Sequence, residues 1–243
     1  MIVKNPIGLI GDTLGTFPVL QQLNKDHEHF SVVINEDARD LYSLVPEIRI
    51  CECNKADKEL NLSGAFTTAH MHGIYMVQAH YPFMGYSIPE KPIKADLRII
   101  DITTKDTKFY DYVIAPFGRS APNEQKWSMD KWVQLIESMP EFSFAILGNS
   151  KYDDWAAPVP ENATLFFDRS MNDVGYTLQR AKYGCISIVT GISHFCYHLG
   201  VKNYLLTNQT GMTWGENPDC IAIRDHIPTL EPKTVYDLLS QER

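Results

Sequence analysis

Val189-Thr190-Gly191-Ile192-Ser193-His194 is the stretch that decides the fold prediction. Residues 184–189 form an apolar run typical of a buried strand, and a helical pattern opens at Ser193-His194, directly after the Thr190-Gly191 turn. A helix that begins where a strand ends directs backbone N–H groups at the carboxyl edge of the sheet, where open α/β sheets bind anions such as diphosphates. We therefore expect an anion site at residues 190–194.

A second stretch of this kind lies near the N-terminus. The apolar residues 7–10 are interpreted as a strand, and Gly11-Asp12-Thr13-Leu14-Gly15 as a tight turn that leads into a helix. Two strand–turn–helix segments in one chain predict two half-sites that face each other.

Composition restricts the classes of protein to consider. The chain has 243 residues, of which 44% are hydrophobic and 21% charged, which is ordinary for one large or two small globular domains. No apolar run is long enough to cross a bilayer and no signal peptide is evident, so we expect a cytoplasmic protein. The net charge of −8 argues mildly against broad nucleic-acid binding. The five cysteines lack zinc-site spacing, so reduced thiols are expected.

The alternation of strand-like and helix-like segments predicts an α/β fold with parallel sheets. Strands are expected at residues 7–10, 30–34, 48–51, 97–102 (extended), 112–115, 142–147, 164–167, 185–189 and 204–207. Helices are expected at residues 13–25, 36–44, 65–79, 128–138, 152–156, 171–181, 194–199 and 235–240. Residues 54–63 are interpreted as a loop. The charged segment within 103–111 is the predicted linker, which gives domains of residues 1–105 and 106–243.

Three motifs occur in an order that resembles the heptosyltransferase-like glycosyltransferases. They are residues 11–20 (GDTLGTFPVL), the pair 115–119 (APFGR) and 126–132 (KWSMDKW), and residues 189–194 (VTGISH). The resemblance covers the first ~25 residues and most of residues 112–210. It implies the GT-B fold, in which two Rossmann-like domains with parallel sheets face each other across a cleft. Two positions depart from the family pattern: Val189 stands where the family has an acidic residue, and Ser128 where it has proline.

The resemblance implies a metal-independent, inverting glycosyltransferase that uses a nucleotide-diphosphate sugar as donor and needs no cofactor. The family places its catalytic base in the segment of Asp12. From the residues alone, Asp12 could equally be a helix N-cap. Gly11 and Thr13, together with His70 and His72, are expected on the acceptor side, although the helix around the two histidines could be ordinary core.

Donor binding is expected from Arg119 and Lys126, which would oppose the charge of the diphosphate, and from residues of the second strand–turn–helix segment. Both cations could instead be ordinary surface residues. The residues expected from that segment are Thr190, Gly191, Ile192, Ser193 and His194. Asp153 could hold a ribose hydroxyl, or it could complement the dipole of a short helix. The chain lacks Asp-x-Asp, the usual metal clamp of other glycosyltransferases, and we predict no metal site.

The sequence does not determine the acceptor. A saccharide or lipid-linked hydroxyl is the first expectation, and heptose or a related sugar the first guess for the group transferred. A modified base in phage DNA is a second possibility, and a non-catalytic nucleotide-sugar-binding module, motivated by Val189, is a third. The sequence predicts neither the nucleotide nor the oligomeric state.

Overall fold

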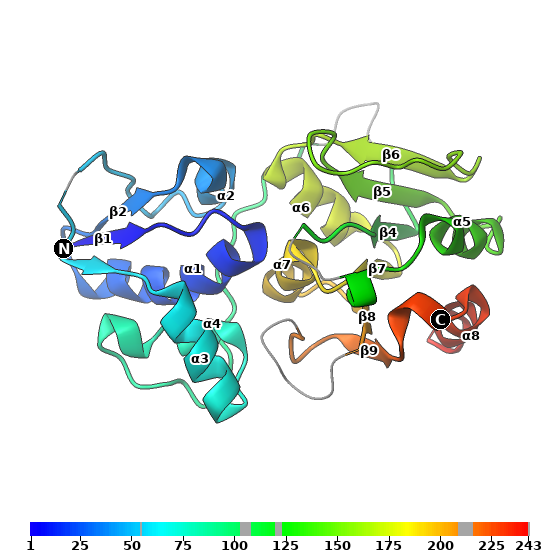
Figure 1. Cartoon of the computed structure of the whole chain (residues 1–243). Helices are drawn as coiled ribbons and strands as arrows, with labels where there is room; N and C mark the ends of the chain where they lie inside the picture. Colours follow the sequence, from blue (N-terminus) through cyan, green and yellow to red (C-terminus); the bar gives the residue numbers. More distant parts are fainter. Residues whose placement is uncertain (54, 103–107, 120–122, 209–215, 243) are drawn as a thin grey trace. The chain divides into compact units, whose positions relative to one another are not determined.

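The computed structural model describes residues 1–53, 55–102, 108–119, 123–208 and 216–242 (Figure 1). The chain divides into two compact units. The first comprises Met1–Ile99 together with residues 216–218, and the second comprises the other described residues from Ile100 onward. Part of the predicted linker, residues 103–107, lies outside the described residues. In the described part of the chain, no helix is both long and apolar enough to cross a bilayer.

The first unit contains a three-stranded parallel sheet in the order β2-β1-β3. Its strands are β1 (Ile2–Asn5), β2 (Ser31–Ile34) and β3 (Lys58–Glu59). Its helical elements are α1 (Ile10–Asp26), the 3₁₀ turn Glu36–Ala38, α2 (Arg39–Tyr42), α3 (Leu62–His72), α4 (Met76–Ala79) and the 3₁₀ turn Pro82–Met84.

The predicted strand at residues 7–10 is wrong, because the strand lies earlier, at β1, and helix α1 already begins at Ile10. A hydrogen-bonded loop separates the two elements. The Asn5 side chain accepts from the Ile7 N–H at 3.2 Å, and Asn35 Nδ2 donates to the Pro6 carbonyl at 3.0 Å. The apolar residues 7–9 belong to this loop and Ile10 to the helix, whose apolar side chains, such as Leu14 and Phe17, are buried.

Three other predictions for the first unit need correction. The strand at 48–51 reduces to one bridge between Val32 and Ile50, and the third strand is the short, polar β3 inside the predicted loop. The helix at 65–79 is two helices, because Gly73 ends α3 in the left-handed conformation with φ of 59°. Residues 97–102 form no strand.

The second unit contains a six-stranded parallel sheet in the order β6-β5-β4-β7-β8-β9. Numbered within the unit, this is the 3-2-1-4-5-6 order of the Rossmann fold. The strands are β4 (Tyr112–Ala115), β5 (Phe144–Gly148), β6 (Ala163–Phe167), β7 (Gly184–Ile188), β8 (Asn203–Thr207) and β9 (Ile221–Arg224). The predicted α/β fold with parallel sheets is confirmed.

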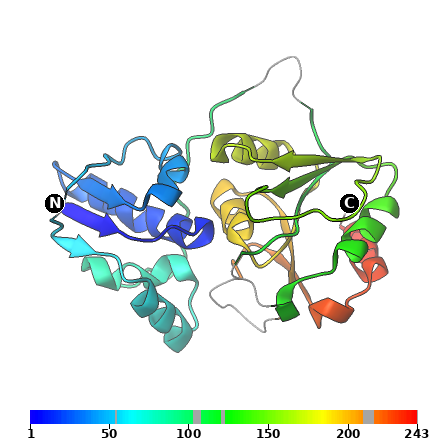
Figure 2. The same cartoon turned by 45° about the horizontal axis from the view of Figure 1, so that its top comes forward.

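Helices cover both faces of this sheet (Figure 2). Helices α6 (Met171–Arg180) and α7 (Gly191–Leu199) pack together on one face, and α5 (Met129–Glu137) and α8 (Pro232–Gln241) on the other. The predicted helix at 152–156 is wrong, because the segment is a turn and loop that bury Trp155.

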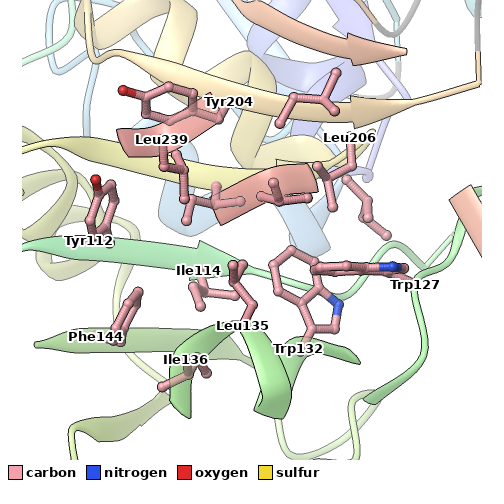
Figure 3. Close-up of a cluster of buried hydrophobic side chains, with 14 of the residues drawn as sticks. Tyr112, Ile114, Trp127, Trp132, Leu135, Ile136, Phe144, Tyr204, Leu206 and Leu239 are labelled. Atoms are coloured by element: carbon pink, nitrogen blue, oxygen red, sulfur yellow. The ribbon is translucent and has the colours of Figure 1, made fainter. Parts of the chain in front are cut away.

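The core beneath α5 and α8 is rich in aromatic side chains (Figure 3). Trp127 and Trp132 meet edge to face with ring centroids 4.9 Å apart, and Trp127 Nε1 donates to the Leu230 carbonyl at 2.8 Å. These contacts anchor the chain just before α5. As a result, the exposed Lys126 directly precedes a residue, Trp127, that is buried in the core.

Candidate functional site

The strand order of the second unit reverses between β4 and β7, which makes the carboxyl ends of these strands its topological switch point. Ala115 lies opposite Ser187 in the register of the two strands. Residues 116–119, which follow β4, and the start of α7, which follows β7, therefore leave the sheet side by side. In open α/β sheets, ligands bind in the crevice outside such a switch point.

The start of α7 offers backbone donors at this point. Thr190 is the N-cap residue in an extended conformation (φ −155°, ψ 168°), and the buried Ser193 hydroxyl donates back to the Thr190 carbonyl at 2.6 Å. Ser193 therefore shapes the helix start and does not present its hydroxyl to a ligand. Gly191 and Ile192 are half-buried, and the first N–H groups of a helix have no acceptor within it. The Ser193 N–H, by contrast, already donates to the Thr190 carbonyl at 3.0 Å. The donors available to an anion are thus main-chain amides.

His194 lies in the same turn but is buried. Its side chain is 4% exposed, and burial lowers the pKa of the imidazole to about 4. The imidazole is therefore uncharged at neutral pH. The hydrogen bond from His194 to a diphosphate stays a prediction, and a neutral ring would donate it. His198, one turn on, is also buried. Within the described ranges, no group of three or more His, Cys, Asp or Glu side chains could hold a metal ion.

Two cations lie after β4. Arg119 is exposed, and its guanidinium carbon lies 4.2 Å from the ring centroid of Tyr152. Lys126 is exposed and precedes α5, which starts at the same edge of the sheet. The ring of Tyr152 thus joins the loop after β4 to the loop after β5. The sequence patterns did not single out Tyr152, because nothing in the sequence pairs it with a residue 33 positions away.

The loop after β5 is held by two of its own side chains and by Asp168, which follows β6. Asp153 Oδ2 accepts from the Asn149 N–H at 2.8 Å, Asn149 Oδ1 accepts from the Lys151 N–H at 3.0 Å, and Asp168 Oδ1 accepts from the Ser150 N–H at 2.8 Å. These amides are therefore already occupied.

The two aspartates that hold this loop, Asp153 within it and Asp168 directly after β6, differ in their electrostatics. The hydrogen bonds from Ser150 lower the pKa of Asp168, whereas burial raises that of Asp153. The ribose role of Asp153 stays a prediction, with one carboxylate oxygen engaged. The helix-dipole alternative is wrong, because no helix forms there.

In the first unit, Asp12 is the third residue of α1 and is half-buried. The N-cap residue is Leu9, so the N-cap interpretation of Asp12 is wrong. A carboxylate in the first turn still complements the helix dipole. The buried Thr13 hydroxyl donates to the Ile7 carbonyl at 3.1 Å and so braces the loop after β1.

The remaining acceptor predictions fall on residues of two kinds. Gly11 is buried in the first turn of α1, whereas His70 and His72 are exposed on the last turn of α3. The exposed histidines could contact a ligand, and their acceptor role stays a prediction, as does that of Gly11.

A cavity of about 630 Å³ lies elsewhere in the second unit. Lys182, Gly184, Lys202 and Tyr204 line it, and these residues lie at the amino ends of β7 and β8. It is thus at the opposite end of the strands from the switch point and takes no part in the candidate site.

No protein-family model and no curated protein matches the sequence. Among solved structures, the E. coli heptosyltransferase WaaC with ADP shares 14% identity at a TM-score of 0.72, covering 100% of this chain and 99% of WaaC. A glycosyl transferase family 9 protein from Veillonella parvula shares 11% identity at 0.71, covering 99% and 96%. TibC, an iron-containing dodecameric glycosyltransferase of enterotoxigenic E. coli, shares 15% at 0.66. That match covers 90% of this chain, and the chain spans only 61% of TibC. At these identities the likeness concerns the fold: two parallel α/β sheets, as in the GT-B heptosyltransferases.

Proposed function

We propose that this chain is a glycosyltransferase that moves a sugar from a nucleotide-diphosphate donor to an acceptor hydroxyl. One observation carries the proposal. The switch point of the six-stranded sheet presents the amides of Gly191 and Ile192, with the cations Arg119 and Lys126 at the same sheet edge. Backbone donors and fixed cations are what a diphosphate requires. The fold is also that of WaaC, whose structure was solved with ADP.

The reaction we propose is an inverting substitution. The Asp12 carboxylate removes the proton of the acceptor hydroxyl, and the oxygen forms the new bond to the anomeric carbon of the donor sugar. The bond from that carbon to the diphosphate breaks, and its electron pair leaves with the nucleoside diphosphate. Donors at Gly191 and Ile192 stabilise the charge that develops on the leaving group. The step requires no oxidant or cofactor.

Metal independence is part of this proposal. The cations of Arg119 and Lys126 and the helix amides would supply the positive charge that other glycosyltransferases take from a metal held by Asp-x-Asp, which this chain lacks. TibC is described as iron-containing, so the point needs its own test. Activity should be unchanged after treatment with a chelator, and loss of activity that added metal restores would refute it.

For the acceptor we propose a saccharide or lipid-linked hydroxyl in the cytoplasm, with a heptose as the first sugar to try. The proposal is tested by a thermal-shift screen of nucleoside diphosphates and their sugars, followed by measurement of nucleoside diphosphate release. A ligand at a hundred times its Kd stabilises by about 2.7 kcal/mol, which raises Tm by roughly 5–10 °C in a chain of this size.

The screen separates the competing functions. Donor-dependent release with saccharide acceptors supports the proposal. Release of nucleoside diphosphate only with modified duplex DNA, together with strongly salt-dependent binding of that DNA, would instead support a glycosyltransferase that acts on DNA. Donor binding without turnover by any acceptor or by water would identify a binding module, and no stabilisation by any nucleotide would refute all three.

A further inference from the structure

The loop after β5 carries one exposed aromatic side chain on a rigid support. Tyr152 is 47% exposed, whereas the backbone beneath it is fixed by the side chains of Asn149, Asp153 and Asp168. Asp168 adopts φ of 55°, an unfavourable conformation for a residue other than glycine. Strain of this kind persists only where the surrounding structure fixes it, and it is common in ligand sites.

Two cationic side chains lie close to the Tyr152 ring. The Arg119 guanidinium carbon lies 4.2 Å from its centroid, and Lys151 Nζ lies 4.9 Å from it. A guanidinium this close to a ring centroid forms a cation–π pair. Arg119 is exposed, so the pair is accessible to solvent and presents π surface at the carboxyl edge of the sheet.

The position of this pair relative to the helix amides determines its use. Tyr152 follows β5, which is separated from β7 by the single strand β4. Neighbouring strands lie about 4.8 Å apart, so the ends of β5 and β7 are roughly 10 Å apart. In a donor whose diphosphate lies on the α7 amides, the ribose separates the diphosphate from the base. A base that extends from there toward β4 and β5 would reach the Tyr152 ring.

We infer that Tyr152 and Arg119 form a stacking platform for the nucleobase of the donor. This inference rests on the proposed function, because it takes the diphosphate to bind at Gly191 and Ile192. Bases stack on aromatic rings and on guanidinium planes regardless of their hydrogen-bonding edges. The platform thus contributes affinity for the nucleotide and selects for a flat ring system, whereas the helix amides bind the charged group.

The test compares a nucleotide with a ligand that has no base. Binding of inorganic pyrophosphate, and of whichever of ADP, GDP or UDP binds most tightly, is measured by calorimetry on the full chain. Tyr152→Ala should weaken nucleotide binding about 10-fold, within the range reported for loss of one base–aromatic stack. It should leave pyrophosphate binding unchanged within twofold. Tyr152→Phe keeps the ring and should keep nucleotide affinity.

Arg119→Lys provides an independent variant, because it keeps the charge and removes the plane. It should weaken nucleotide binding several-fold more than pyrophosphate binding, for which the retained charge matters most. Equal effects of Tyr152→Ala on both ligands, or no effect on either, would overturn the inference while leaving the proposed function intact. Failure of the wild-type chain to bind any of these ligands would instead overturn the proposed function. Unfolding curves of the variants should match the wild type, since both side chains are exposed.

Discussion

Replacement of Gly191 by proline is the most selective test of the α7 amides. Gly191 is the first residue of α7, a position where proline is favoured because its N–H has no acceptor within the helix. The preceding Thr190 has φ −155° and ψ 168°, in the extended region that a residue before proline prefers. The substitution should therefore remove one hydrogen-bond donor and leave the helix intact.

The magnitude follows from the bond that is lost. A hydrogen bond to a charged group contributes about 1.5–3 kcal/mol, which corresponds to roughly a 10- to 150-fold increase in Kd. Proline at a compatible position stabilises the fold by about 0.4–1 kcal/mol, so Tm should be unchanged or slightly higher. Weaker binding without a loss of stability distinguishes loss of a donor from general damage to the fold.

Calorimetric titration with pyrophosphate and with the best nucleoside diphosphate measures the effect, and thermal unfolding checks the fold. Gly191→Ala is the matched control, because it changes the same position and keeps the N–H group. Pyrophosphate binding by Gly191→Pro as tight as by wild type would refute the assignment of the diphosphate to this helix start. A Tm lowered by several degrees would refute the argument that proline fits there.

Three further predictions concern catalysis, pH and packing. Asp12→Asn should retain donor binding and abolish nucleoside diphosphate release, because an amide cannot accept the acceptor proton; release at the wild-type rate would exclude Asp12 as the base. His80 is buried at the end of α4, and burial lowers the pKa of its imidazole from 6.5 to about 4. Between these values the unfolded chain binds more protons than the folded chain, so the free energy of unfolding decreases as the pH is lowered. Urea unfolding should show His80 costing roughly 2 kcal/mol between pH 7 and pH 5, and a pH dependence unaltered in His80→Leu would contradict this. In Gly148→Ala the new Cβ would overlap the Phe167 ring, which should lower stability by about 1–3 kcal/mol; Phe167→Leu should recover part of the loss, and a neutral Gly148→Ala would show that the ring can move.

Most strands of the second unit could be predicted because they have a clear apolar pattern, whereas the half-buried edge strand β9 was missed. Residues 112–115 and 184–189 are continuous apolar runs, typical of strands buried on both faces, and β4 and β7 lie there. A helix directly after β7 followed from the same pattern, but its start was predicted at His194, and α7 begins three residues earlier, at Gly191. The fold class and a helix start at the carboxyl end of β7 were thus accessible from local sequence alone.

The first unit could be predicted less well, for physical reasons that differ between elements. The apolar residues 7–10 form a loop and a helix start. Hydrogen bonds that the side chains of Asn5 and Asn35 make hold this loop, and an apolar pattern alone does not distinguish it from a strand. Strand β3 is a two-residue polar segment whose pairing with β1 leaves no periodic signal. Such elements are set by tertiary contacts.

The Arg119–Tyr152 contact shows the same limit at the site. Each residue alone is compatible with an ordinary exposed loop position, and only the adjacency of β4 and β5 brings them together. Likewise, the burial that makes His194 neutral depends on how α7 packs on the sheet. Sequence motifs predicted the candidate site, whereas its charges and contacts required the fold.

A crystal structure with the tightest-binding nucleoside diphosphate would show where the diphosphate binds. We expect its oxygens to accept hydrogen bonds from the N–H groups of Gly191 and Ile192, at the carboxyl ends of β4 and β7. A diphosphate bound instead in the cavity lined by Lys182 and Lys202, at the other end of the strands, would contradict it.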